Sequence, residues 1–309
     1  MKASTCILCK NKLLFAVIGL FIVTSFCSCT VMNYRYKSWD KTVSRNEDGI
    51  LEFAQAWEKG EGENALLFVH GFADGPHVWE PLGTELAERG YSVKALRLPG
   101  WNEPIENKRT INLDDWEEAI VHEVSDLKLT HPKVVVLSHS MGGCLTTVLA
   151  QNHELTADAL VLYAPMFAIS NERSPLFTSR TWFKIGNAVL PRGLIIESKY
   201  EEHARVNLPR PKTARDPFSP KNFYNMLFDS MDIFEAQSPE LDMPLCLVLP
   251  GEDHVVSNPR AQQWFEDVNA PIKTLVIDEP SGHVLPLDIN ELAESDRLVI
   301  WLTEQGIAP

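Results

Sequence analysis

The sequence predicts an α/β fold built on a mainly parallel, doubly wound sheet, and two observations carry this prediction. Short runs of β-branched and aliphatic residues, such as Val134–Leu137, alternate with segments of helical spacing along most of the 309 residues. Unbroken apolar runs of this kind are typical of strands buried on both faces of a parallel sheet. Their alternation with helices implies right-handed crossovers, with helices on both faces of the sheet.

The first part of the predicted core spans residues 61–165 and follows a lead-in, residues 29–60, in which we expect a tether and edge strands. Strands are expected at Ala65–His70, Ser92–Leu98, Val134–Leu137 and Ala159–Tyr163. Helices are expected at Val78–Arg89, Leu113–Leu129 and Cys144–Gln151. Acidic residues at 114 and 115 suit the first turn of the second helix, because they oppose the positive end of its dipole.

The alternation stops over residues 166–241 and resumes over residues 242–309. The later elements are expected at Leu245–Leu249, Pro259–Asp267, Thr274–Ile277 and Glu291–Thr303. Within the interruption, Asn222–Phe234 places aromatic and Met side chains on one helical stripe. Any single one of these residues is explained by core packing. An insertion of this size in a doubly wound sheet nevertheless predicts a cap over the active site.

The serine at position 140 lies where a predicted strand meets a predicted helix, in Ser138-His139-Ser140-Met141-Gly142-Gly143. Small residues around a serine at such a turn indicate a nucleophile elbow, a tight turn that lifts the hydroxyl above the sheet edge. The usual pattern is G-x-S-x-G, and here Ser138 occupies the first position. A nucleophilic serine needs a base within hydrogen-bond reach and an acid that orients the base.

Two residues beyond later strands fit these roles in the expected order of serine, acid and histidine. Asp253 follows the strand Leu245–Leu249, and His283 follows the strand Thr274–Ile277. Because the carboxyl ends of parallel strands meet at one edge, these side chains are expected near Ser140. Glu252 and Asp278 remain alternatives to Asp253 as the acid.

Acyl transfer also requires backbone N–H donors for the oxyanion. We expect one donor at Met141, directly after the serine, and the other at Phe72, in the loop that follows the first central strand. Gly71 would allow the close approach of that loop. The neighbouring His70 and His139 are interpreted as structural residues rather than as alternative bases.

The composition of the chain indicates which classes of binding partner and cofactor to expect. The formal net charge is −14, without basic runs, which argues against nucleic acid as a partner. Cys144 and Cys246 lie in apolar stretches and are expected to be buried free thiols. No His or Cys cluster has metal-ligand spacing outside the N-terminal segment, and we expect neither a metal nor another cofactor.

Residues 1–28 are predicted to be a signal peptide. A basic start precedes Leu13–Val23, an apolar run too short for a comfortable membrane span. The ending before Cys29 resembles a bacterial lipoprotein signal, which implies cleavage and lipidation at Cys29. We therefore expect a cell-envelope protein held on the membrane, in the outer membrane and facing the periplasm; ordinary secretion and an uncleaved signal anchor are the alternatives.

Together these motifs resemble the α/β-hydrolases of the monoacylglycerol lipase and carboxylesterase type. The resemblance rests on HGF at 70–72, SHSMGG at 138–143, GEDHVV at 251–256 and SGHVLPLD at 281–288. LDDWEEAI at 113–120 and LPGW at 98–101 are also similar, although Trp101 stands where such enzymes often have His. The resemblance implies Ser140 as nucleophile, His283 as base, Asp253 as its orienting acid, and Phe72 and Met141 as oxyanion donors. It also implies that the cap, residues 166–241, forms the acyl pocket.

The expected function is that of a serine carboxylesterase or lipase-like hydrolase that cleaves short- to medium-chain or monoacylglycerol-like esters through an acyl-enzyme. An apolar cap and a membrane-proximal anchor favour such small acyl esters over peptides. Two alternatives stay open: a thioesterase or deacylase of cell-envelope molecules with the same triad, and a catalytically silent binding or scaffold lipoprotein.

Overall fold

The computed structural model describes residues 29–172, 174, 176–198 and 215–309, and the predicted signal peptide therefore lies outside the described residues. Its centre is a seven-stranded sheet of order β1-β3-β2-β4-β5-β8-β9, in which only β1 runs antiparallel to its neighbour. The strands are β1 (Trp57–Lys59), β2 (Ala65–Val69), β3 (Ser92–Leu96), β4 (Val134–His139), β5 (Ala159–Tyr163), β8 (Leu245–Pro250) and β9 (Lys273–Asp278). The predicted fold class, a mainly parallel α/β sheet, is confirmed.

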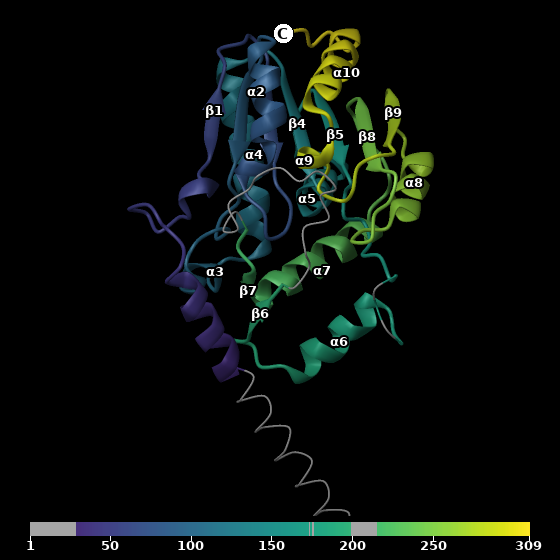
Figure 1. Ribbon diagram of the computed structural model, residues 1–309. Coiled ribbons are helices and arrows are strands. Elements are labelled where there is room, and N and C mark those ends of the chain that lie inside the picture. The colour runs from purple at the N-terminus through teal and green to yellow at the C-terminus, as the bar shows by residue number, and fades with distance from the viewer. Residues whose placement is uncertain (1–28, 173, 175, 199–214) are drawn as a thin grey trace, which may run out of the picture.

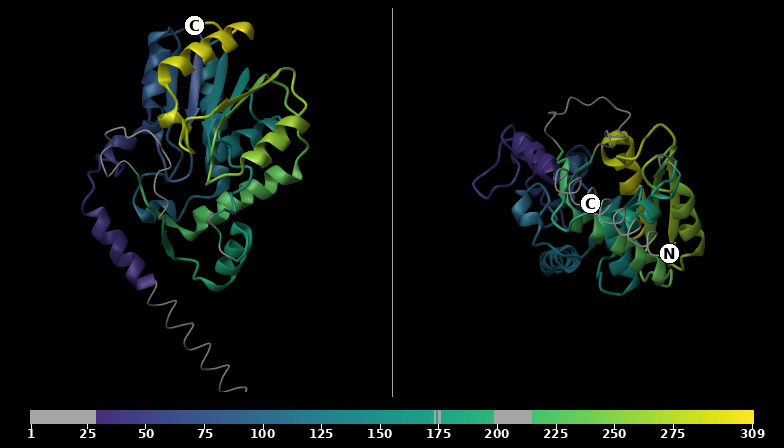
Figure 2. Two further views of the ribbon diagram at one scale, coloured as in Figure 1. Left: turned by 45° about the vertical axis from the view of Figure 1, so that its right-hand side comes forward. Right: turned by 90° about the horizontal axis from the view of Figure 1, so that it is seen from below.

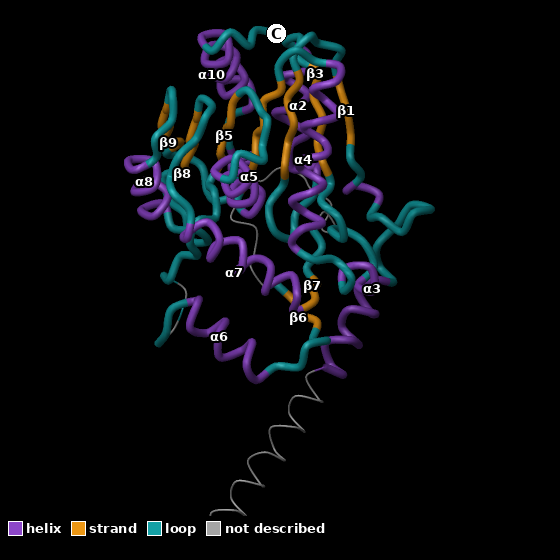
Figure 3. Tube along the Cα trace, turned by 180° about the vertical axis from the view of Figure 1, so that it is seen from behind, coloured by secondary structure: helices purple, strands orange, loops and turns teal. Residues whose placement is uncertain are grey.

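Helices flank the sheet on both faces, as Figure 1 and the view from behind in Figure 3 show. The main ones are α2 (Glu80–Glu88), α4 (Leu113–Thr130), α5 (Met141–Gln151), α8 (Asn258–Asp267) and α10 (Glu291–Glu304). Shorter helical segments are η1 (Glu52–Ala54), η2 (Pro76–Trp79), α3 (Ile105–Lys108) and α9 (Leu285–Asp288). Every residue of β2, β4, β5 and β8 is buried, which explains why these strands read as continuous apolar runs.

The start of α4 illustrates how sequence sets an element boundary. The Asn112 side chain accepts a hydrogen bond from the Asp115 backbone N–H, and the Asp115 carboxylate accepts one from the Asn112 N–H. This capping box satisfies two backbone donors that the first helical turn leaves unpaired. The next helix after a strand, α5, begins directly behind Ser140 without a side-chain cap.

Between β5 and β8 the chain leaves the sheet and forms α6 (Ser179–Val189), β6 (Ile195–Glu197), β7 (Phe218–Pro220) and α7 (Lys221–Ala236). Figure 1 shows α7 crossing beneath the carboxyl ends of the central strands, with α6 further out. Phe223, Phe228 and Phe234 of α7 are buried, and Phe234 stacks on Phe167, which follows β5, at 4.1 Å between ring centroids. The apolar stripe predicted for this helix therefore packs into the main hydrophobic core. The division of the chain into core and cap stays a prediction.

The lead-in contains a helix that the sequence analysis did not expect. Residues 29–40 are helical and lie at the same end of the molecule as α6, opposite the C-terminus (Figure 1; Figure 2). Tyr36 is buried in a small cluster with Ile105 and Phe218, and its hydroxyl accepts a hydrogen bond from the Ile105 N–H at 2.9 Å. Contacts with segments distant in sequence thus hold this helix, and local spacing alone did not indicate them. Within the part of the chain that the structure describes, no helix combines the length and hydropathy of a membrane span.

Candidate active site

Ser140 lies in a strained turn between β4 and α5. Its backbone has φ 52° and ψ −115°, in the positive-φ region that residues other than glycine rarely adopt. The turn is held on both sides: the Ser140 N–H donates to the Tyr163 carbonyl at 3.0 Å, and the Ser140 carbonyl accepts from the Met166 N–H at 2.9 Å. The neighbouring β5 and the loop behind it therefore keep the side chain of Ser140 at the sheet edge.

The small residues around Ser140 are required by close packing. A Cβ on Gly142 would lie 2.6 Å from the His70 carbonyl oxygen, and one on Gly71 would lie 3.0 Å from the Ser140 Cβ. The loop after β2 thus passes directly against the turn. Ser138 is completely buried and its hydroxyl lies 2.8 Å from that of Thr146 on α5, so this departure from the usual glycine joins strand to helix.

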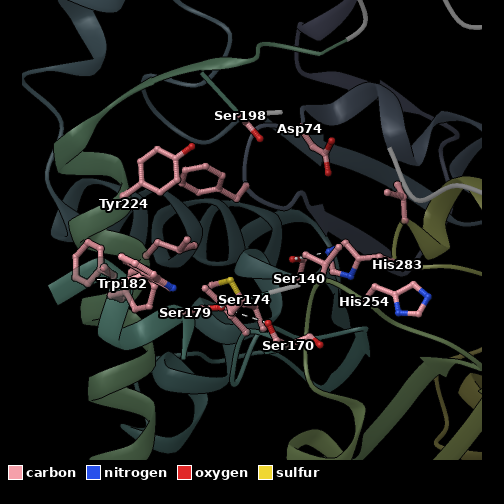
Figure 4. Close-up of a pocket in the computed structure, with 18 of the residues that line it drawn as sticks. Asp74, Ser140, Ser170, Ser174, Ser179, Trp182, Ser198, Tyr224, His254 and His283 are labelled. Carbon is pink, nitrogen blue, oxygen red and sulfur yellow. Dashed lines mark hydrogen bonds between the residues drawn. The ribbon is translucent and has the colours of Figure 1, made fainter. Parts of the chain in front are cut away.

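A continuous hydrogen-bond chain connects Ser140, His283 and Asp253. The His283 Nε2 lies 3.1 Å from the Ser140 Oγ (Figure 4). The His283 Nδ1 lies 2.8 Å from an Asp253 carboxylate oxygen. A carboxylate only accepts, so the Nδ1 carries the proton and the Nε2 of the neutral ring is free to accept the serine proton. This arrangement can activate a hydroxyl for attack on a carbonyl carbon.

Asp253 is ionised by its surroundings. Burial by itself would raise its pKa, but the adjacent His283 imidazole and hydrogen bonds outweigh that effect and hold the pKa of this carboxyl below its usual range. Its other oxygen accepts from the backbone N–H groups of Val255 and Val256 at 2.8 and 2.9 Å. Of the alternative acids, Asp278 accepts instead from the Ser281 hydroxyl.

The two neighbouring histidines contact backbone groups. The Leu98 N–H donates to the His70 Nε2 at 3.1 Å, and the His70 Nδ1 lies 2.8 Å from the Gly71 carbonyl. The His139 Nε2 lies 2.9 Å from the His283 carbonyl. Burial lowers the pKa to about 4 for His70 and to about 3 for His139, so both rings are neutral at ordinary pH.

Phe72 and Met141 both belong to segments that lie against Ser140. Met141 is the first residue of α5, and Phe72 follows Gly71 in the loop that passes against the Ser140 turn. The Phe72 ring packs between Trp101 and Tyr224, with centroid distances of 4.8 and 4.9 Å. Trp101 is completely buried, and its ring contact with Phe72 supports this loop.

A cavity of about 430 Å³ opens at Ser140 and His283. Its apolar lining includes Met166, Ile169, Trp182, Phe183, Leu227 and Phe228. Figure 4 shows Trp182 and Tyr224 on one side of the cavity and Ser140 with His283 on the other. The segment between β5 and β8 thus contributes much of the wall.

The cavity also contains polar residues that the sequence analysis missed: Asp74, Ser198, Arg215 and His254. Two of them carried a usable signal, since Asp74 follows β2 near Phe72 and His254 follows Asp253. The His254 Nδ1 pairs with the Glu172 carboxylate at 2.6 Å and so joins the loop after β8 to the loop after β5. Ser198 and Arg215 lie far from any motif.

The three cysteines in the described part of the chain are free, with Cys144 and Cys246 buried as predicted. Cys29 is half-buried at the start of the helical residues 29–40. Among the described residues, no group of three His, Cys, Asp or Glu side chains is arranged to hold a metal ion.

Comparison with known proteins agrees with this architecture. A protein-family model for serine aminopeptidase, S33, matches residues 60–290. The chain is 25% identical over 244 residues to a thermostable monoacylglycerol lipase of Bacillus sp. (strain H-257), covering 78% of this chain and 91% of that enzyme. It is 24% identical over 279 residues to the monoglyceride lipase of Homo sapiens, covering 84% of this chain and 89% of that one.

Solved structures show the same fold. The monoacylglycerol lipase of Paleococcus ferrophilus matches with a TM-score of 0.67 at 18% sequence identity, covering 81% of this chain and 98% of that chain. A structure from work on LipS and LipT, two metagenome-derived lipolytic enzymes, matches with a TM-score of 0.71 at 20% identity, covering 82% and 99%.

Proposed function

The chain belongs to the serine aminopeptidase S33 family and is a serine ester hydrolase, and from this premise we propose that it cleaves short- to medium-chain acyl esters through Ser140, His283 and Asp253. The observation that carries the proposal is the hydrogen-bond chain from Asp253 through His283 to Ser140. Ser140 and His283 also line a largely apolar cavity.

In the proposed acylation step, the Ser140 Oγ attacks the ester carbonyl carbon while its proton passes to the His283 Nε2. The carbonyl oxygen becomes an oxyanion, which accepts hydrogen bonds from the backbone N–H groups of Phe72 and Met141. Collapse of this intermediate breaks the ester C–O bond, and the departing alkoxide takes the proton from the His283 Nε2. Asp253 stabilises the imidazolium that exists between the two transfers.

Deacylation repeats this chemistry with water. His283 removes a proton from a water molecule while the water oxygen attacks the carbonyl carbon of the acyl-enzyme. The His283 Nε2 then passes this proton to the Ser140 Oγ as the carboxylic acid leaves. These transfers use only side chains and backbone groups of this chain.

The size and lining of the cavity support small acyl esters as substrates. Ligand sites commonly span roughly 300–1,000 Å³. The cavity of about 430 Å³ is at the lower end of that range and is lined largely by aromatic and aliphatic side chains. Two similar proteins are named monoacylglycerol or monoglyceride lipases, which supports a substrate of the same class here.

Labelling with a fluorophosphonate tests the nucleophile. We expect the wild-type chain to be labelled, Ser140→Ala to be unlabelled and His283→Ala to be labelled slowly. Ser125→Ala, which removes an exposed hydroxyl on α4, provides the matched control and should be labelled like the wild type. Equal labelling of all variants would contradict the proposal. A p-nitrophenyl ester series should show a maximum at short or medium acyl length, and faster turnover of peptides than of esters would exclude the substrate class.

We further propose that Cys29 is the lipidated first residue of a mature envelope protein, held in the outer membrane and facing the periplasm. This rests on the signal-like residues 1–28, which end directly before Cys29. Mass spectrometry of the mature N-terminus should find the acyl mass on Cys29, abolished by Cys29→Ser and retained in the matched variant Cys27→Ser. An unmodified or uncleaved terminus would overturn this assignment.

A further inference from the structure

The helix of residues 29–40 lies against the two-stranded hairpin of β6 and β7 (Figure 1). The Arg35 guanidinium pairs with the Glu197 carboxylate of β6, with nitrogen–oxygen distances of 2.7 Å. The Phe218 ring of β7 packs against Tyr36 and Trp39, with centroid distances of 5.8 and 5.5 Å. Glu197 and Phe218 are paired directly opposite each other in the hairpin. One helix therefore holds both strands at the same level.

The same helix is fixed to the segment that follows β3. Tyr36 is 4% exposed, and its hydroxyl accepts a hydrogen bond from the Ile105 N–H at 2.9 Å. Just beyond the helix, Arg45 pairs with Asp40 at 2.7 Å and donates to the Asn102 carbonyl at 3.0 Å. Asn102 and Ile105 both lie between β3 and α4. The helix thus connects the hairpin to a segment that leaves the central sheet.

The hairpin leads directly into the wall of the cavity. Ser198 follows β6 and lines the cavity, and its N–H donates to the Pro217 carbonyl at 2.7 Å. The other strand, β7, continues without a break into α7, whose Tyr224, Leu227 and Phe228 also line the cavity. Each strand of the hairpin has only three residues, and an isolated hairpin is marginally stable at best. The position of this wall therefore depends on what packs against the hairpin.

We propose that the helix of residues 29–40 is a positioning element of the active site, which holds the wall formed by Ser198 and α7 in the arrangement that an acyl chain requires. Lys108 holds β7 through the Phe218 carbonyl, and the helix adds contacts with a side chain of each strand. Without these contacts the wall would be ordered only when the acyl chain binds, which weakens binding. The inference rests on the proposed function, because it assigns a support to that site.

The reacting groups do not depend on the helix in the same way. Ser140 is held by hydrogen bonds to Tyr163 of β5 and to Met166 in the loop behind it. An acyl group too short to lie along the wall should therefore react normally when the helix is displaced. The dependence on acyl length separates a positioning role from a general support of the fold.

The test compares p-nitrophenyl octanoate with p-nitrophenyl acetate, and kcat and KM are measured on both esters with the full-length chain. We expect Tyr36→Ala to raise KM for the octanoate roughly tenfold, the effect of side chains that become ordered only on binding. Both constants for the acetate should change little. Tyr36→Phe retains the ring that packs on Phe218 and should restore most of the octanoate KM.

Tyr34→Ala is the matched control, since Tyr34 lies on the same helix, is 74% exposed and should leave the octanoate KM unchanged. The ion pair provides an independent arm. Arg35→Glu places two carboxylates together and should raise the octanoate KM, and combining it with Glu197→Arg should restore the wild-type value. Lys37→Glu makes the same change of charge at an exposed position of the helix and should have no effect.

Hydrogen–deuterium exchange follows the wall without any substrate. The backbone amides of residues 218–228 should exchange faster in Tyr36→Ala than in Tyr34→Ala or the wild type. Unchanged exchange in this segment, or equal proportional losses of kcat/KM on both esters, would overturn the inference. If Tyr36→Ala does not fold, Arg35→Glu and the exchanged pair decide by the same criteria. Undiminished hydrolysis of both esters by Ser140→Ala would instead refute the proposed function, and the exchange rates would still decide the role of the helix.

Discussion

Replacing Asp253 with Asn should lower kcat for ester hydrolysis by a factor on the order of 10⁴. The oxygen that receives the Val255 and Val256 N–H groups must stay an acceptor, so the Asn carboxamide would turn its NH₂ toward the His283 Nδ1. That donor forces the imidazole proton onto Nε2, where the ring can no longer accept the Ser140 proton. The geometry of the site would remain while its base is disabled.

Steady-state kinetics on a p-nitrophenyl ester measure this effect. We expect kcat to decrease while KM changes little. Glu252→Gln provides the matched control: it neutralises the adjacent carboxylate, one of the two alternative acids in the sequence, and should change kcat only a few-fold. A loss in Glu252→Gln as large as in Asp253→Asn would refute the role of Asp253, as would near wild-type kcat in Asp253→Asn.

Removing one partner of the Lys108–Asp216 ion pair should lower the free energy of unfolding by about 3–5 kcal/mol. Both side chains are completely buried, and the Lys108 Nζ also donates to the Phe218 carbonyl at 2.7 Å. Burial lowers the pKa of Lys108, and the contact with Asp216 opposes that shift only in part. In Asp216→Leu the ammonium group would have to be neutralised or solvated, which destabilises the folded state.

Urea denaturation of Asp216→Leu, Lys108→Met and the double variant measures how much of the lost stability comes from the interaction between these two side chains. The double variant should recover most of the lost stability, because it buries no unpaired charge. Glu80→Gln is the control for an exposed pair with Lys59 and should cost less than about 1 kcal/mol. Additive losses in the double variant would show that the two side chains do not act as a pair.

Elements with strong local signals could be predicted closely from the sequence. The boundaries of β5 match the prediction residue for residue, since Ala159–Tyr163 is an apolar run with clear ends. The expected helix Val78–Arg89 begins instead with the 3₁₀ turn η2, which has Pro76 at its start and is followed by α2. The proximity of Ser140, Asp253 and His283 followed from strand order, and their catalytic roles stay predictions.

Features that depend on distant segments could not be predicted. The Lys108–Asp216 pair joins residues 108 positions apart, and neither residue lies in a motif. Ser138 had no functional interpretation until its contact with Thr146 showed a structural one. Asp74 was overlooked for a different reason: the sequence places it after the first central strand, but only the structure shows that it lines the same cavity as Ser140.

The packing of Phe72 has an entropic consequence. Its ring is held between Trp101, which follows β3, and Tyr224 of α7, and Trp101 in turn contacts Phe223 at 4.7 Å between ring centroids. The conformational freedom of the loop is therefore lost when the chain folds and not when the ester binds. The proposed oxyanion donor is in place before the reaction begins, and the free energy of substrate binding is not spent on ordering it.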